Sequence, residues 1–202
     1  MTRRTWLLLV PAVVAGLAHT PAGTPGRHEH DAAAQISFDI PKDWSAADEQ
    51  TLFRQGFIVP PLPMYSFVAA PTKLPSHVAL LASSVPWLFV NVQDIGDPVP
   101  PDQLYNLAPN YLEQLATQGG GNVSGVRALV PHHAVHQGGL NGSSAAFTVV
   151  APGDSTSFDE VAYERGSQVW MVIAGCSAYC YYNNQVLMTG IIRSVRVGTA
   201  AG

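Results

Sequence analysis

The pattern of apolar and polar positions predicts strands in the first part of the chain. Residues 36–40 alternate between apolar and polar side chains, which is typical of a half-buried strand, and residues 41–44 form a turn after it. Residues 45–58 predict a short helix with Ser45 as its N-cap. An apolar stretch over 78–92 predicts one or two buried strands. The residues expected to point inward from this stretch are Trp87, Phe89 and Val92.

A helix is predicted over residues 102–118, because the apolar residues recur there at helical spacing. They form one continuous stripe of Leu104, Leu107, Ala108, Tyr111, Leu112 and Leu115. The glycines at 119–121 end this helix. Pro109 lies in the middle of the segment, where a proline removes one hydrogen bond of a regular helix. We therefore expect a kink or a break at Pro109.

The second half of the chain predicts antiparallel strands followed by a helix. The expected strands are 126–130, 134–137, 145–150, 158–164 and 168–174. Turns are expected at 138–139, 141–142 and 165–167. A helix over 182–194 and a short strand over 195–197 follow. Strands grouped together with one central and one late helix indicate the α+β class, an antiparallel sheet flanked by helices.

Three features occur in a characteristic order. The opening strand runs into a Pro-x-x-Trp turn (Pro41, Trp44), the central amphipathic helix precedes a series of strands, and the last helix runs into residues 191–197. This order resembles the PsbP-like superfamily, and within it the exported actinobacterial proteins of the LpqN type. The resemblance implies an αβα sandwich and a non-catalytic role in binding proteins or envelope lipids. The chain has no lipobox cysteine, so the resemblance does not extend to lipoprotein anchoring.

The first 22 residues predict a secretory signal peptide. Arg3 and Arg4 precede an apolar run of 13 residues, Trp6 to Ala18, which prolines then interrupt. A helix that spans a bilayer needs about 20 apolar residues, so export is favoured over a permanent anchor, and cleavage is left open. Residues 23–34 are expected to form a flexible leader and residues 35–198 a single α+β domain. The protein is therefore expected to be secreted or located in the cell envelope.

Export changes the interpretation of the only two cysteines, Cys176 and Cys180. In an oxidising compartment an isolated pair of cysteines usually forms a disulfide. The gap between them permits the bond where the segment turns or is helical, because positions i and i+4 of a helix lie about 6 Å apart. We expect a structural disulfide that fixes a local turn.

Composition excludes nucleic acid as a partner. Charged residues make up only 12% of the chain, and the 14 acidic residues outnumber the 10 basic ones. A protein that binds phosphate backbones carries the opposite charge. The glycines at 119–121 follow a helix instead of a strand, so they do not form a dinucleotide-binding loop, and no cofactor is expected.

A catalytic alternative rests on the histidines of residues 131–136. On a strand, His132 and His136 share a face about 13 Å apart, too far to hold one ion, while His133 points the other way. No Gly-x-Ser-x-Gly string is present, and residues 141–144 are expected to form a hairpin turn. No metal site is predicted. The alternative is an exported hydrolase or metal-dependent enzyme that uses the three histidines with Asp154 or Asp159.

The aromatic residues are a further candidate for a binding role, although most of them are expected to lie in the core. A sheet covered by helices often leaves an apolar cleft between its layers, and the Pro-rich segment 59–75 is expected to form the edge of this cleft. The candidate ligand-binding residues are Met64, Tyr65, Phe67, Trp87 and Trp170. The leading expectation is a secreted or envelope-associated binding protein without catalysis. It is expected to hold an envelope lipid or a partner protein and to associate peripherally with the envelope.

Overall fold

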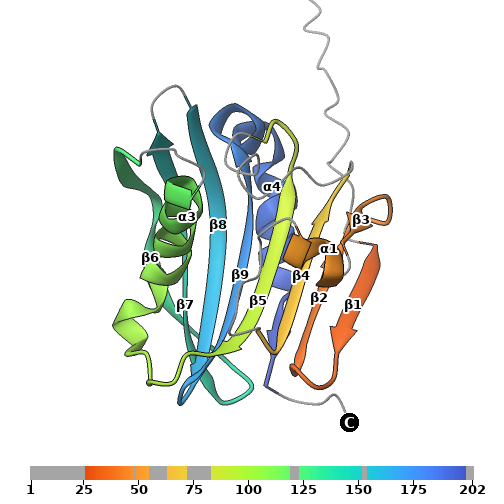
Figure 1. Cartoon of the computed structure of the whole chain (residues 1–202), viewed down its shortest axis with the longest axis vertical. Coiled ribbons are helices and arrows are strands. Elements are labelled where there is room, and N and C mark those ends of the chain that lie inside the picture. The colour runs from red at the N-terminus through yellow and green to blue at the C-terminus, as the bar shows by residue number, and fades with distance from the viewer. Residues whose placement is uncertain are drawn as a thin grey trace, which may run out of the picture.

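The computed structural model describes residues 26–47, 49–54, 63–71, 83–118, 123–151 and 154–198. The signal peptide expected at residues 1–22 lies outside these ranges, as do parts of the Pro-rich segment 59–75 and residues 78–82. The described residues form a seven-stranded antiparallel sheet, a small three-stranded sheet and helices that cover both faces of the main sheet (Figure 1).

The main sheet places its strands in the order β3-β4-β5-β9-β8-β7-β6. Their bounds are β3 (Ser45–Ala46), β4 (Tyr65–Ala70), β5 (Trp87–Asp94), β9 (Gln168–Ser177), β8 (Asp154–Arg165), β7 (Leu140–Ala151) and β6 (Gly125–Gln137). Strands β6 to β9 are neighbours in both sequence and space, as the sequence predicts for a series of hairpins. Gly138 and Gly139 make the turn between β6 and β7, and Gly166 lies in the turn between β8 and β9, with φ values of 56°, 78° and 63°, which favour glycine.

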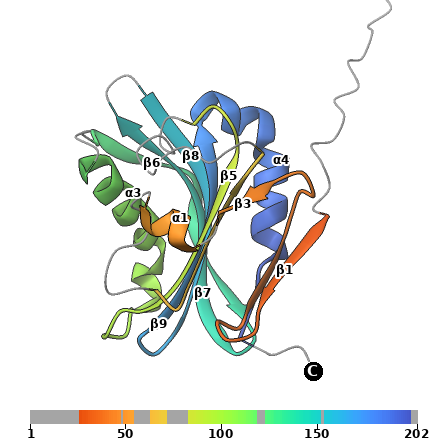
Figure 2. The ribbon, with the colours of Figure 1, turned by 45° about the vertical axis from the view of Figure 1, so that its right-hand side comes forward.

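Two layers cover the main sheet (Figure 2). The 3-10 helix η1 (Pro101–Asn106) and helix α3 (Leu107–Gln118) pack on one face over β7, β8 and β9. Helix α4 (Ala178–Ser194) packs on β8 and β9 from the other face and also contacts β2. Strands β1 (Arg27–Asp31), β2 (Ile36–Ile40) and β10 (Arg196–Val197) form the small sheet beside α4, and α1 (Glu49–Arg54) contacts β4. The predicted α+β class, an antiparallel sheet flanked by helices, is confirmed.

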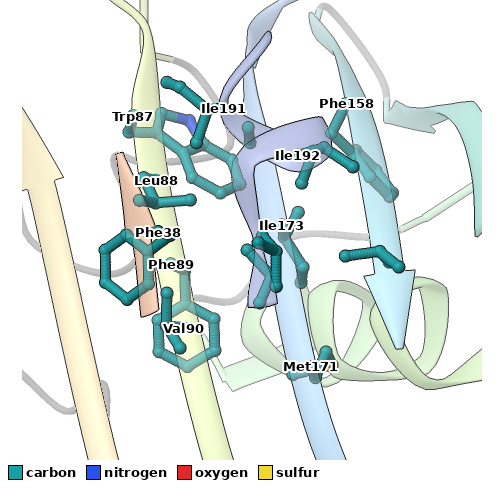
Figure 3. Packing of buried hydrophobic residues seen from close by; sticks show 14 of the residues in the cluster. Phe38, Trp87, Leu88, Phe89, Val90, Phe158, Met171, Ile173, Ile191 and Ile192 are labelled. Atoms are coloured by element: carbon teal, nitrogen blue, oxygen red, sulfur yellow. The ribbon is translucent and has the colours of Figure 1, made fainter. Parts of the chain in front are cut away.

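The central strands are buried on both faces, which explains their nearly continuous apolar sequences. Phe89 pairs with Ile173 in the ladder, and both side chains face η1 and α3, where Phe89 stacks on Tyr111. Leu88 and Val90 alternate with Phe89 and face α4 (Figure 3). The core therefore consists of two apolar layers, one on each side of the main sheet.

The prediction of a flexible leader over residues 23–34 is wrong for Arg27–Asp31, because these residues form β1. This strand pairs with β2 from Arg27 opposite Ile40 to Asp31 opposite Ile36. Its side chains are polar and half-buried or exposed, so the segment has no hydrophobic pattern. The backbone ladder to β2 stabilises it, together with bonds such as that from Arg27 Nη1 to the carbonyl of Trp44 (3.0 Å).

Two expected local structures are replaced by strands. Ser45 does not cap a helix, because it pairs with Ala70 in β3 and α1 begins only at Glu49. The turn expected at residues 141–144 is part of β7, and Gly138-Gly139 alone makes that turn. Gly142 is needed for close packing instead: a Cβ atom there would lie 2.5 Å from the carbonyl oxygen of Ala162.

The predicted helix over 102–118 is divided, although not at Pro109. The 3-10 helix ends at Asn106 and α3 begins at Leu107, so Pro109 lies in the first turn of α3. An amide hydrogen in the first turn has no carbonyl partner within the helix, and a proline there loses no hydrogen bond.

The last helix begins four residues earlier than its predicted start at 182 and includes Cys180 in its first turn. Cys176, near the end of β9, forms the expected disulfide with Cys180 across a Cα–Cα distance of 5.8 Å. The disulfide prediction is confirmed, and the bond fixes the connection between β9 and α4.

Candidate functional site

A pocket of about 390 Å³ lies between α3 and the β6–β7 edge of the main sheet. Val126, Ala128 and Phe147 supply apolar walls from the strands. The polar residues that line it are Asn106, Asn110 and Glu113 from η1 and α3. A volume of this size is at the lower end of the range typical of small-molecule sites, about 300–1,000 Å³. The pocket therefore combines apolar walls with a few polar groups.

A stacked pair of rings forms one wall of the pocket. The ring of Tyr105 in η1 and the imidazole of His132 in β6 lie parallel, with centroids 4.0 Å apart and an interplanar angle of 4°. The β6–β7 register shifts between Ala128 and Val130 and again between Val130 and His133. Such irregularities re-aim side chains at the edge of a sheet, and here they surround Pro131, which has no amide hydrogen to donate.

The charge of the pocket is negative. Glu113 is the only carboxylate among the described residues that line it, and none of those residues is Lys or Arg. Glu113 is exposed and takes part in neither of the two salt bridges found between described residues. Arg127 is the residue between Val126 and Ala128, and strand alternation points it to the opposite face of β6.

A buried carboxyl lies under the first turn of α3. Glu160 in β8 is fully buried, and its Oε1 accepts a hydrogen bond from the backbone amide of Ala108 (3.2 Å). Its Oε2 has no hydrogen-bond partner. Burial raises the pKa of Glu160 well above its usual range, and the bond from Ala108 opposes that shift. The residue after Ala108 is Pro109, which lines the pocket, so Glu160 supports the same turn of α3 from below.

Asp159, the neighbouring residue of β8, faces the opposite layer. Its carboxylate accepts hydrogen bonds from the Tyr181 hydroxyl (2.5 Å) and from Thr189 Oγ1 (2.7 Å), both on α4. Burial raises the pKa of Asp159, although these two bonds and the charge of Arg193 oppose the shift. Burial also raises the pKa of Tyr181, and the bond to Asp159 raises it further. Asp159 therefore ties α4 to the sheet.

The structure does not bring the five predicted ligand-binding residues together. Met64 is 56% exposed and Tyr65 is half-buried, while Phe67, Trp87 and Trp170 belong to the core. Phe67 packs edge-to-face on Phe38 in β2, on the α4 side. Trp87 pairs with Gly175 on the α3 side. Their proposed binding role stays a prediction.

Trp170 is a structural residue of the core whose indole nitrogen has a hydrogen-bond partner. The ladder places it opposite Val92 and Tyr163, on the side of the small sheet, and its Nε1 donates to the carbonyl of Ala34 (2.7 Å). This bond satisfies the polar atom of a fully buried indole. The residue links the main sheet to the small sheet.

His132 and Asp159 lie on opposite sides of the main sheet. Asp159 points to the α4 layer, whereas His132 stacks on Tyr105 in the η1 layer. The side chain of Asp154 is outside the described part of the chain. Within the described ranges, no three His, Cys, Asp or Glu side chains lie close enough to hold a metal ion. The histidine-based enzyme stays an untested alternative.

Residues of the actual pocket were missed from sequence. The missed lining residues include Tyr105, Asn106, Asn110, Glu113 and Phe147. Three of them recur at i, i+4 and i+7 along the predicted helix, so a polar stripe was present beside the apolar one. The stripe alone does not reveal which strand it faces, because β6 lies later in the chain and η1 interrupts the helix.

Comparisons with known proteins identify the fold. Neither the family models nor the curated proteins gave a match. Among solved structures, the cyanobacterial PsbP (CyanoP) of Synechocystis sp. PCC 6803 is 10% identical, with a TM-score of 0.55 over 91% of this chain and 98% of that chain. LpqN of Mycobacterium tuberculosis, described as involved in cell envelope biogenesis, is 11% identical, with a TM-score of 0.46 over 81% and 83% of the two chains. The chain therefore has a PsbP-like fold, as the resemblance found in its sequence implied.

None of the helices in the described ranges has the length and hydrophobicity required to cross a membrane.

Proposed function

We propose that this chain is a secreted or envelope-associated binding protein without catalytic activity, and that it holds an envelope lipid in the pocket between α3 and β6. The pocket carries this proposal, because its apolar strand residues suit a hydrocarbon chain and its amides suit the polar end of the same molecule. Its volume of about 390 Å³ suits one chain better than a whole two-chain lipid.

Two observations support export. The chain begins with the pattern of a signal peptide, and its two cysteines form a disulfide. Disulfides persist in oxidising compartments and are rare where thiols are kept reduced. Peripheral association with the envelope would follow from the bound lipid.

The arrangement of acidic residues and histidines supports a binding role over a catalytic one. A general acid–base mechanism needs its groups within hydrogen-bond reach of a common substrate. Here Asp159 is engaged by Tyr181 and Thr189 on the far side of the sheet from His132. Glu160 lies under α3, fully buried from solvent.

Native mass spectrometry of the protein purified from its own host tests the proposal. We expect the wild-type protein to carry a lipid mass. Ala128→Trp places an indole among the pocket walls and should remove that mass. Ala134→Trp introduces the same residue at an exposed position of the same strand, outside the pocket, and should keep it.

Two results would contradict the proposal: no lipid mass on the wild-type protein, or equal lipid occupancy of both tryptophan variants. Crosslinking in the host envelope addresses the partner-protein interpretation. A specific crosslinked partner together with the absence of lipid would replace lipid binding with protein binding.

A further inference from the structure

The charges around the pocket restrict the chemistry of its ligand. Glu113 is its single carboxylate, and Lys and Arg are absent from the described lining residues. The nearest basic residue in the sequence of β6, Arg127, points to the opposite face of the strand. An anionic head group placed beside Glu113 would meet a like charge and find no cation from the described walls.

The stacked rings of the pocket also favour a cationic head group. Tyr105 and His132 both line the pocket, and their rings stack in parallel with centroids 4.0 Å apart, so each ring covers one face of the other. The face of a tyrosine ring attracts cations, and quaternary ammonium groups are commonly bound by aromatic walls. The carboxylate and the aromatic wall therefore favour the same head group.

We propose that the pocket selects amphiphiles by head-group charge, and that it binds a single-chain molecule with a cationic head in preference to one with an anionic head. This inference rests on the proposed function, since it assumes that a hydrocarbon chain occupies the pocket. It adds that the bound molecule carries an ammonium group near Glu113. Asn106 and Asn110 supply amide groups that can bind a neutral head, so a neutral head should have intermediate affinity.

Three probes with the same chain separate the head group from the tail: decyltrimethylammonium, decyl maltoside and decyl sulfate. Isothermal titration calorimetry below the critical micelle concentration gives the affinity of each probe for the purified protein. We expect decyltrimethylammonium to bind roughly fivefold to tenfold more tightly than decyl sulfate, since attraction and repulsion at one exposed carboxylate each contribute modestly. Added salt should reduce that ratio, because it screens exposed charges.

Two matched variants test whether Glu113 causes the preference for a cationic head group. Glu113→Gln should bring the cation-to-anion ratio to within about twofold, because it removes the single carboxylate of the described lining. Glu164→Gln removes the same charge from a half-buried residue of β8 outside the pocket and should keep the ratio of the wild-type protein. Because Glu113 is exposed, its replacement should not prevent folding.

The outcomes distinguish this inference from the proposed function. If all three probes bind equally, or decyl sulfate binds most tightly, and Ala128→Trp still abolishes binding, the charge preference is overturned while lipid binding stands. Equal loss of the ratio in Glu113→Gln and Glu164→Gln would also overturn it, because the preference would then come from net charge. If no probe binds, or Ala128→Trp leaves binding intact, the proposed function fails together with the inference.

Discussion

Replacing Glu160 with glutamine should remove a loss of stability that the wild-type protein suffers as the pH rises. The difference in the free energy of unfolding between Glu160→Gln and the wild type should therefore grow with pH. Glu160 is fully buried, and burial raises the pKa of its carboxyl well above the ordinary value of 4.5. In the unfolded chain the same carboxyl is solvated and titrates near that ordinary value. Between the two pKa values the folded state therefore binds one more proton than the unfolded state, and stability falls with increasing pH.

The size of the effect follows from this linkage. Each pH unit between the two pKa values lowers the free energy of unfolding by about 1.4 kcal/mol. The contribution of Glu160 is complete below about pH 4.5 and stops changing above the raised pKa. From pH 5 to pH 7 the wild-type protein should lose up to about 3 kcal/mol relative to Glu160→Gln. Glutamine keeps an oxygen that can accept the bond from Ala108, so the first turn of α3 retains its partner.

Urea denaturation at pH 5, 6 and 7, followed by tryptophan fluorescence, measures this difference. Asp159 also has a raised pKa, but it is present in both proteins and cancels when their stabilities are subtracted. Glu164→Gln, on the same strand, serves as the control for removing a carboxyl group from β8. A constant difference between wild type and Glu160→Gln would refute the reasoning, because Glu160 would then titrate alike in the folded and unfolded states.

Two further predictions concern the stability contributed by the disulfide and by two glycines. Replacing Cys176 and Cys180 together with serine should lower the free energy of unfolding by about 2 kcal/mol, since the closed loop is short; thermal unfolding with and without reductant checks it, and a variant as stable as the oxidised wild type would contradict it. Gly190→Ala should stabilise α4 by about 1 kcal/mol, because nothing lies within 4 Å of the added Cβ, whereas Gly142→Ala should destabilise the protein, because its Cβ would lie 2.6 Å from the Tyr163 ring; urea midpoints that shift in the same direction would contradict this pair.

Hydrophobic periodicity predicted the fold where one element has one buried face or lies wholly in the core. The strand 36–40, the central helix and the hairpin around Gly166 are confirmed on that basis. Periodicity failed for β1, because a polar strand held by its backbone ladder has no apolar pattern. It also failed for Ser45, since pairing with Ala70 competes with helix capping and depends on a strand that lies 25 residues later.

The candidate site was less accessible from sequence than the fold. Trp87 and Trp170 were included among the candidate ligand-binding residues, although Trp87 was also expected to point inward, because the sequence of a strand does not show whether an aromatic side chain faces a cleft or a core. The pocket instead depends on how η1 lies against β6, whose shifted register goes together with the contact between His132 and Tyr105. Pro131 marks an irregularity in β6, but it does not indicate which residue of η1 the strand faces, so the contact between them appears only in three dimensions.

The adjacent carboxyls of β8 show how the two layers differ. An acidic pair in a strand normally places one side chain in solvent, but here both faces of the sheet are covered. Asp159 has two partners on α4, whereas Glu160 has one on α3 and leaves an oxygen unpartnered. The layer that contains α4 is therefore satisfied in its hydrogen bonding at this point, and the layer that contains α3 is not.

The same asymmetry extends across the sheet. The buried side-chain atoms without a hydrogen-bond partner in the described residues are Ser66 Oγ, Asn91 Oδ1, Ser143 Oγ and Glu160 Oε2. The ladder aligns the first three in one row, from Ser66 opposite Asn91 through Met171 and Ala162 to Ser143, on the face that Glu160 shares. Unpartnered buried polar atoms cost stability, so their confinement to one face argues that this face is not shaped by stability alone. The pocket lies on that same face. The unpartnered polar atoms and the proposed lipid site therefore belong to one layer of the molecule, the one formed by η1 and α3.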